Sequence, residues 1–241
     1  LEQVWENPNL ARFYRQLAEN VQLVLFDKRG SGMSDRVAHA PTPAEIADDV
    51  HCLVTALGRE RVSLFGFSEG GAAAVEFAVR YPGMTDQLVL YGTAARWTRD
   101  DDYRPALTHQ QFDQWREKLI HHWGRGVSIR EFAPSQAQEP AVVDWWAKTM
   151  RLSSSPGEVA RILRSIRDID LRSELPQIQC PTLILHKTDD RVVHFAAAED
   201  LAERIPRARL LRLRGRDHWF WTEDLEKVLG LIQDTLLNAT R

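Results

Sequence analysis

The sequence contains only two cysteines, Cys52 and Cys180, among its 241 residues. Two cysteines cannot build the disulfide framework of a small secreted domain, so we expect a reducing compartment, the cytoplasm. No apolar run reaches the roughly 18 residues that suggest a membrane span. The 31 basic and 34 acidic residues give a net charge of −3, so there is no excess of positive charge for binding nucleic acid.

Motifs for metals and nucleotides are also missing. Histidine, cysteine and carboxylate residues do not cluster at the spacing of metal ligands. The turn DKRGSG, Asp27–Gly32, lacks both the G-x-G-x-x-G pattern and the lysine–serine ending of a P-loop. We therefore expect neither a metal ion nor an organic cofactor.

Short apolar runs alternate with helical stripes along much of the sequence, and 44% of the residues are hydrophobic, enough for one sizeable core. The runs at 21–26, 61–65, 87–91, 181–186 and 209–213 predict strands. The stripes at 43–57, 70–81, 196–205 and 225–237 predict helices. This alternation predicts an α/β fold, a mostly parallel sheet with helices on both faces. The run Val21–Phe26 reads as a strand buried on both faces.

Ser68 stands among small residues, in GFSEGG, where a predicted strand becomes a predicted helix. Ligands of parallel sheets bind beyond the carboxyl ends of the strands. A tight turn there lifts the serine out of the backbone, and we expect Gly66 and Gly70 to relieve the crowding. The backbone N–H of Glu69, at the helix N-terminus, would face any charge that forms beside Ser68. The pattern is that of a nucleophile elbow; the alternative is that Ser68 only caps the helix.

A serine nucleophile needs a base to take its proton and an acid to orient that base. In chains with a nucleophile elbow, the acid and then the histidine come later in the sequence, each in a loop after a later strand of the sheet. Asp189 and Asp190 follow the predicted strand 181–186, and His218 follows the predicted strand 209–213. We therefore interpret Ser68, one of the two aspartates and His218 as a catalytic triad.

Four motifs together resemble the α/β-hydrolase superfamily, and the resemblance extends over the whole chain. They are FDKRGSGMSD at 26–35, GFSEGG at 66–71, PTLILHKTDDRVV at 181–193 and GRDHWFW at 215–221. In such relatives the acid directly precedes R-V-V or its equivalent, so the resemblance implies Asp190 rather than Asp189. The subgroup that looks most similar includes freestanding hydrolases and hydrolase domains fused to nucleotide cyclases or transcription regulators.

The strand pattern stops between residues 96 and 175, where amphipathic stretches carry five tryptophans. We expect a helical insertion there, a mobile lid whose aromatic side chains roof an apolar pocket over Ser68. Residues 1–95 and 176–241 would then form the hydrolase core.

The beginning of the sequence departs from the resembled pattern. The superfamily has a strand and a loop before its first helix, and one N–H of that loop completes the oxyanion hole with the N–H after the serine. This sequence starts at that helix, in LEQVWENPNL. We expect that roughly 25 to 40 residues of the fold precede Leu1; otherwise another chain supplies them, or the protein is not catalytic.

The sequence thus predicts a serine hydrolase that cleaves a carboxylic ester or related acyl bond of a small apolar substrate. Ser68 would attack, His218 would transfer the proton, Asp190 would orient His218, and the Glu69 N–H would stabilise the oxyanion. One alternative is a hydrolase-fold module that senses a small ligand and regulates an attached or partner domain. Another is a C–C bond hydrolase or perhydrolase that uses the same triad.

Overall fold

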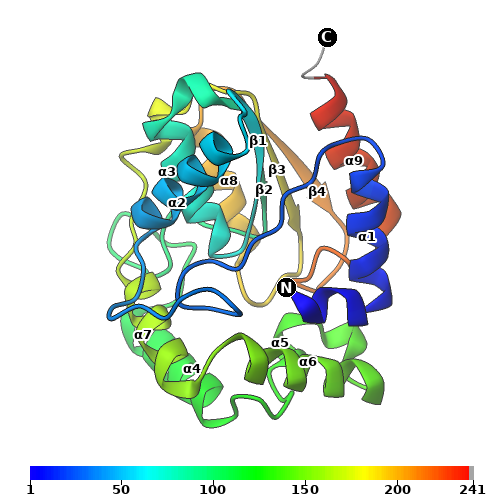
Figure 1. The fold of residues 1–241 in the computed structure, drawn as a ribbon. Coiled ribbons are helices and arrows are strands. Elements are labelled where there is room, and N and C mark those ends of the chain that lie inside the picture. The colour runs from blue at the N-terminus through cyan, green and yellow to red at the C-terminus, as the bar shows by residue number, and fades with distance from the viewer. Residues whose placement is uncertain (239–241) are drawn as a thin grey trace.

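Four of the apolar runs form one parallel sheet in the computed structural model, which describes residues 1–238 (Figure 1). The strands are β1 (Val62–Phe67), β2 (Thr85–Tyr91), β3 (Thr182–Lys187) and β4 (Ala208–Leu213), and they lie side by side in this order. All three pairings are parallel. Each strand end lies within two residues of its predicted position, and the prediction of an α/β fold with a parallel sheet is confirmed.

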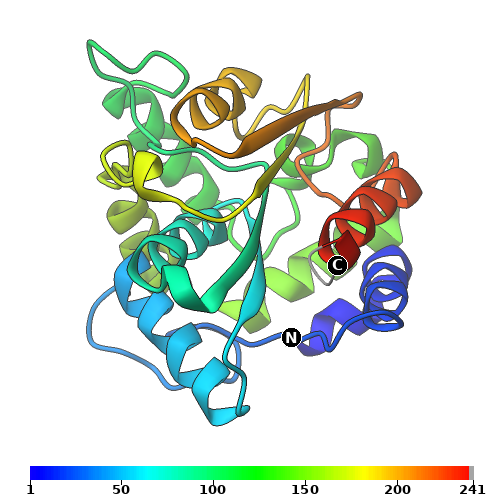
Figure 2. The same ribbon diagram turned by 90° about the horizontal axis from the view of Figure 1, so that it is seen from above.

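Helices cover both faces of the sheet (Figure 2). On one face lie α2 (Pro43–Ala56), α3 (Gly70–Arg80) and α8 (Phe195–Arg204), and on the other lie α1 (Pro8–Ala18) and α9 (Leu225–Asn238). Short 3₁₀ turns occur at Glu2–Glu6, Pro82–Met84, Pro134–Gln136 and Leu175–Gln177. Two apolar cores result, one between α3, α8 and the sheet and one between α1, α9 and the sheet. Parallel strands need this double cover because both of their faces are apolar.

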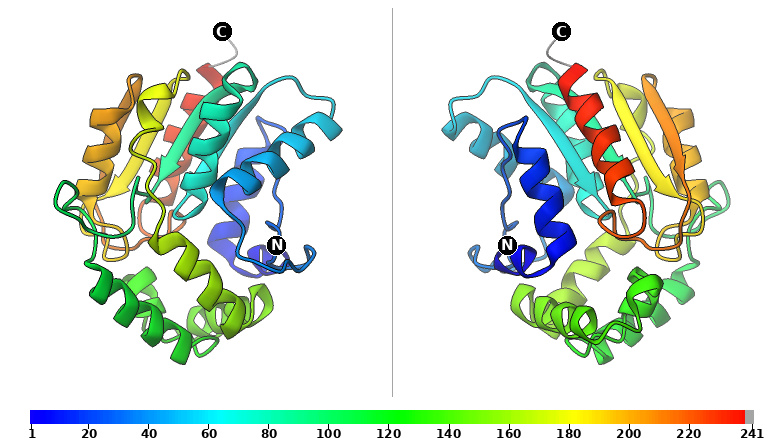
Figure 3. Two further views of the ribbon diagram at one scale, coloured as in Figure 1. Left: turned by 90° about the vertical axis from the view of Figure 1, so that its left-hand side faces the viewer. Right: turned by 90° about the vertical axis from the view of Figure 1, so that its right-hand side faces the viewer.

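Four further helices gather at the end of the sheet to which the strands point (Figure 3). They are α4 (His109–His121), α5 (Ile129–Phe132), α6 (Pro140–Ser153) and α7 (Pro156–Arg167). Local sequence explains two of their starts: Thr108 forms a capping box with Gln111, and the Ser155 side chain accepts the Glu158 N–H. The chain therefore leaves the sheet after β2, builds this helical group and returns at β3.

Val21–Phe26 does not form a strand, so that prediction is wrong. Its side chains alternate between half-buried and exposed, and the exposed fractions of Val24 and Phe26 are 46% and 37%. Phe26 lines the same cavity as Leu64 and Phe65 of β1. A strand exists only where a neighbour completes its hydrogen-bond ladder, and β1, an edge of the sheet, pairs with β2 alone among the described residues.

Two negative findings apply to residues 1–238. Within this range no helix is long and apolar enough to cross a membrane. The same range has no group of three or more histidine, cysteine, aspartate or glutamate side chains arranged to hold a metal ion.

Candidate active site

Ser68 occupies a strained turn between β1 and α3. Its φ angle is +53°, in the left-handed region that residues other than glycine rarely adopt. The Ser68 N–H donates to the Tyr91 carbonyl at 3.0 Å, which fixes the turn against the end of β2. Strain of this kind persists only where the surrounding structure holds it, and it clusters at functional sites.

Glycines make the tight turn sterically possible. A Cβ on Gly66 would lie 2.7 Å from the Gly71 Cα, and a Cβ on Gly71 would lie 2.4 Å from the Thr93 hydroxyl oxygen. A Cβ on Gly70, in contrast, would have no described atom within 4 Å apart from its chain neighbours and the nearby backbone of its own helix. The expectation that Gly70 relieves crowding is therefore wrong, because the close approach of the helix to the sheet runs through Gly66 and Gly71.

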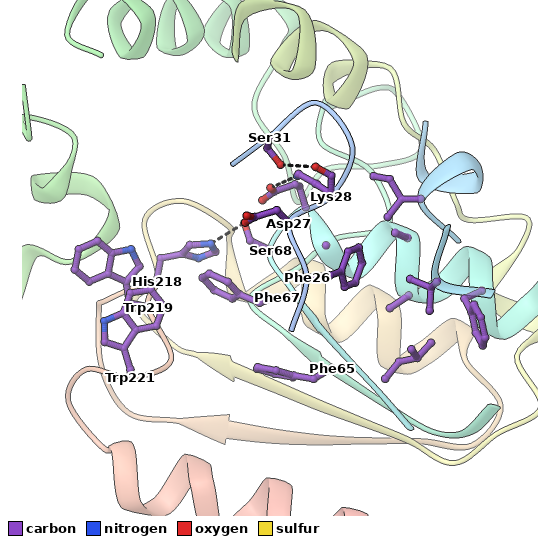
Figure 4. Close-up of a pocket in the computed structure, with 18 of the residues that line it drawn as sticks. Phe26, Asp27, Lys28, Ser31, Phe65, Phe67, Ser68, His218, Trp219 and Trp221 are labelled. Atoms are coloured by element: carbon purple, nitrogen blue, oxygen red, sulfur yellow. Dashed lines mark hydrogen bonds and ion pairs between the residues drawn. The ribbon is translucent and has the colours of Figure 1, made fainter. Parts of the chain in front are cut away.

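The side chains of Ser68, His218 and Asp190 form a continuous hydrogen-bonded series (Figure 4 shows Ser68 and His218). His218 Nε2 lies 2.9 Å from Ser68 Oγ, and His218 Nδ1 lies 2.7 Å from Asp190 Oδ2. All three residues are buried. They come from the loops after β1, β3 and β4, so the carboxyl ends of three parallel strands bring together residues up to 150 positions apart.

Asp190 and its neighbour Asp189 lie in different surroundings. Asp190 Oδ1 accepts the N–H groups of Val192 at 2.8 Å and Val193 at 3.1 Å, whereas Asp189 is exposed and bonds to Thr188. Burial by itself raises the pKa of Asp190, but the charge and hydrogen bond of His218, together with the charge of His186 and the Val193 N–H, more than offset burial, so the pKa is lowered. The structure thus places an ionised carboxylate on the far side of the histidine ring, in the position expected for Asp190.

Glu69 is the N-cap residue of α3, beside the serine. The N–H groups at a helix N-terminus have no intrahelical partners, and the helix dipole favours negative charge there. Glu69 also lines the cavity beside the serine, and its side chain forms an ion pair with Lys28 at 2.7 Å. Burial raises the pKa of Glu69, but the charge and hydrogen bond of Lys28, together with the backbone N–H of Glu69 and the charge of His218, more than offset burial, so the pKa is lowered. The Lys28 ammonium thereby balances the charge of this carboxylate beside the serine.

Three residues that sequence reasoning did not identify shape the surroundings of His218. Gly92, with φ +56°, directly follows β2, and a Cβ there would lie 3.0 Å from the His218 ring. The Phe132 carbonyl, in α5, accepts the His218 N–H at 2.7 Å. His186 is fully buried with its Nε2 3.6 Å from Asp190 Oδ2. Only Gly92 has a sequence signal, a glycine directly after a predicted strand.

A cavity of about 510 Å³ opens beside Ser68 and His218. Its walls are mostly aromatic and aliphatic, with Phe65 and Phe67 from β1, Trp219 and Trp221 from the His218 loop, and Phe132 and Trp146 from the helical group. Of the five tryptophans in the segment 96–175, all within the described residues, only Trp146 lines this cavity. Trp97, Trp115 and Trp123 pack against the core of the helical group, which Trp146 and Phe132 also contact.

The helical group is also bonded to the loop that carries His218. Asp217, fully buried, accepts the Ser135 N–H at 2.9 Å, and the Ser135 hydroxyl donates to its other oxygen. Together with the bond from His218 to Phe132, these contacts join the helical group to the backbone at the histidine itself.

Comparison with known proteins agrees with this architecture. The family model described as serine aminopeptidase, S33, matches residues 9–224. The chain is 32% identical to the AB hydrolase superfamily protein YisY of Bacillus subtilis, over 86% of this chain and 78% of that protein. It is 30% identical to the putative carbamate hydrolase RutD of a Caulobacter species, over 80% of this chain and 72% of that protein.

Among solved structures, an esterase from Exiguobacterium antarcticum matches with a TM-score of 0.81 and 25% identity, covering 95% of this chain and 87% of that one. The family model covers the sheet, the helical group and all three hydrogen-bonded residues. On the strength of the sequence match and the common fold, this chain belongs to the α/β-hydrolase superfamily.

Proposed function

We propose that the protein is a serine hydrolase that cleaves carboxylic esters or related acyl bonds through a covalent acyl-enzyme. The observation that carries the proposal is the hydrogen-bonded series from Ser68 through His218 to Asp190 at the wall of an apolar cavity. Membership of the α/β-hydrolase superfamily supports the same reaction class.

In the first half of the reaction, Ser68 Oγ attacks the substrate carbonyl while His218 Nε2 takes the hydroxyl proton. The negative charge that develops on the carbonyl oxygen is stabilised by the Glu69 N–H at the start of α3. The carboxylate of Asp190 holds the His218 ring in the tautomer with a proton on Nδ1 and stabilises its charged form. His218 then returns the proton to the leaving oxygen, and the acyl group remains on Ser68.

In the second half, water attacks the acyl carbon, and His218 takes a proton from that water. The tetrahedral intermediate collapses, the bond from carbon to Ser68 Oγ breaks, and His218 returns the proton to Ser68. The products are the alcohol and the carboxylic acid, and the enzyme is restored without a cofactor.

The cavity supports a small apolar acyl substrate. Phe65, Phe67 and Leu64 offer surface that buries hydrocarbon. The polar side chains on the wall are Ser68 and His218 of the reacting centre, together with Asp27, Lys28, Ser31 and Glu69. We also propose that residues 96–175 act as a lid, since Phe132 and Trp146 of this segment line the cavity. Their shapes would then set the acyl chain length that the site accepts.

The test is covalent labelling combined with a substrate panel. A fluorophosphonate should label Ser68 of the parent protein and abolish ester cleavage. Ser68→Ala should lose on the order of 10⁶-fold in kcat. The matched control is Ser31→Ala, which removes another hydroxyl from the same cavity wall and should retain activity and labelling.

The panel should contain nitrophenyl esters of increasing chain length together with the matching carbamates and amides. One relative is named a putative carbamate hydrolase and one structural neighbour an esterase, so these two bond types are the most informative pair. Labelling at another residue, or full activity in Ser68→Ala, would refute the proposal. A folded parent that binds apolar ligands and neither cleaves the panel nor reacts with the probe would indicate a sensing module instead.

A further inference from the structure

Lys187, the last residue of β3, carries a charge in the interior of the molecule. Its side chain is 0% exposed. The ammonium donates to the carbonyls of Trp219 and Thr222, both at 3.0 Å, and lies 2.9 Å from the Glu223 carboxylate. An ammonium has three donors, so all of them are used here. Burying a charge is costly unless it is paired and hydrogen-bonded, and these contacts meet that requirement.

All three partners belong to the loop between β4 and α9 that carries His218. Trp219 directly follows the histidine. The Glu223 carboxylate in turn accepts the N–H groups of Arg216 and Asp217, each at 3.2 Å, just before the histidine. The ammonium and the carboxylate thus bind the backbone on both sides of His218.

The loop is shaped around this ion pair. Gly215 has a φ of +135°, and a Cβ there would lie 2.2 Å from Glu223 Oε2 and 3.1 Å from Lys187 Cδ. Lys187 also borders the turn of the proposed acid, since its own carbonyl accepts the Asp190 N–H at 3.4 Å. One residue therefore contacts the loops of both the histidine and the aspartate.

The Lys187 side chain is fully buried, whereas the Glu223 side chain is 23% exposed. Replacing a buried ion pair by apolar side chains is often neutral for stability, and in some proteins such a pair is kept because it fixes the groups around it in one arrangement. At this site the groups beside the pair are the two peptide segments that flank His218, whose Nε2 lies 2.9 Å from the serine oxygen.

We propose that the ion pair of Lys187 with Glu223 holds the ring of His218 in place for proton transfer. The inference rests on the proposed hydrolase function. Lys187 does not line the cavity, so it is a positioning residue and not a catalytic one. A displacement of a catalytic group by about 1 Å can cost roughly 100-fold in rate. Loss of the pair should therefore lower kcat by about 10- to 100-fold and leave KM nearly unchanged.

The experiment compares Lys187→Met with the double variant Lys187→Met/Glu223→Gln, which leaves no unpaired charge behind. The matched control is Arg212→Met, which removes an exposed ion pair with Glu199 from the neighbouring strand. For each protein, urea unfolding establishes that it is folded, and kcat and KM are measured across the pH range. Proton NMR then follows the downfield resonance of His218 Nδ1–H, which reports directly on its bond to Asp190.

We expect the folded Lys187 variants to lose kcat and to shift or broaden the His218 resonance, while Arg212→Met matches the parent in both. If Lys187→Met does not fold, the comparison with the parent is made with the double variant, which leaves no unpaired charge. A folded variant with the kcat and the His218 resonance of the parent would overturn the inference. If the parent itself cleaves no substrate and resists labelling, the proposed function fails, and the resonance of His218 still tests the positioning role.

Discussion

The proposed acid of the triad is one of two adjacent aspartates. Asp189 and Asp190 are adjacent, yet one is exposed and the other is buried against His218. From the residues alone either could be the acid, and only resemblance to related proteins favoured Asp190. The reason lies in the turn after β3, where the N–H groups of Val192 and Val193 hold Asp190 Oδ1 and leave Oδ2 free for the histidine.

Asparagine variants of the two aspartates should differ sharply in activity. Asp190→Asn should reduce kcat by on the order of 10⁴-fold, because a neutral amide no longer stabilises the charged imidazole and favours the wrong tautomer. Asp189→Asn has nearly the same change in size and charge and should stay within a few-fold of the parent. The measurement is kcat/KM for an ester substrate, with circular dichroism as a check on folding. If Asp189→Asn were the inactive variant, the assignment of the acid would be wrong.

Other residues around the site could not be found from the sequence. His186 ends the apolar run 181–186, which reads simply as a buried strand, and Lys187 directly follows that run. Their partners, Glu223 and Asp190, come from other loops, and sequence spacing does not say which side chains face each other across a sheet. Gly92 has a signal, yet its reason, the space taken by the His218 ring, depends on the same three-dimensional contact.

Strands were predicted correctly where a neighbouring strand pairs with them, and incorrectly where none does. The runs of β1–β4 and the stripes of α2, α3, α8 and α9 correspond closely to their predicted ranges. Val21–Phe26 has an equally apolar pattern and is not a strand. Hydrophobic periodicity reports that a segment prefers to be buried, whereas strand formation also requires a partner whose N–H and C=O groups are within reach.

The helical group offers a test of the lid at the level of single helices. Trp146 and Trp123 both pack against the core of the helical group, but Trp146 of α6 also lines the cavity. Trp123 does not line the cavity, and its indole donates to the Ser154 carbonyl at 2.9 Å. Trp146→Leu should enlarge the cavity and shift the preference among nitrophenyl esters toward longer acyl chains. Trp123→Leu removes the same volume elsewhere and should lower stability by about 1–4 kcal/mol without that shift. Identical chain-length profiles in both variants would show that Trp146 does not set substrate choice.

Across the whole molecule, buried ionisable side chains concentrate at the carboxyl end of the sheet. His186, Lys187, Asp190, Asp217 and His218 all lie in or beside the loops after β3 and β4. Elsewhere the two cores are almost entirely apolar. Protonation at this end therefore links the stability of the entire fold to pH, because any group whose pKa differs between the folded and unfolded chain contributes to that dependence.

His186 should make the fold less stable in mild acid. Burial lowers the pKa of this ring, and the charge of Asp190 offsets burial only in part. In the unfolded chain histidine binds a proton at about pH 6.5, while the folded protein resists protonation until a lower pH. The stability that depends on a neutral His186 is therefore fully present above about pH 6.5. The free energy of unfolding falls between that pH and the lower folded pKa, by at most about 1.4 kcal/mol per pH unit.

Urea unfolding between about pH 5 and about pH 8 measures this effect. His186→Gln keeps a side-chain donor for the Val193 carbonyl and cannot titrate, so its stability should fall less steeply than that of the parent over this range. The exposed His121→Gln is the matched control, and its curve should run parallel to the parent curve. Equal slopes for His186→Gln and the parent would contradict the expected contribution of His186.

The wide separation of Ser68, Asp190 and His218 along the chain also determines when activity can return during refolding. The serine lies in the first third of the sequence, the aspartate and the histidine lie in its last quarter, and the helical group folds between them. Contacts between such distant segments form slowly, because the intervening chain must lose its freedom before they are made. Helical signal can recover early from local sequence, whereas turnover must wait until β3 and β4 have joined β1 and β2. The delay between the two signals measures how long helical structure precedes an assembled site.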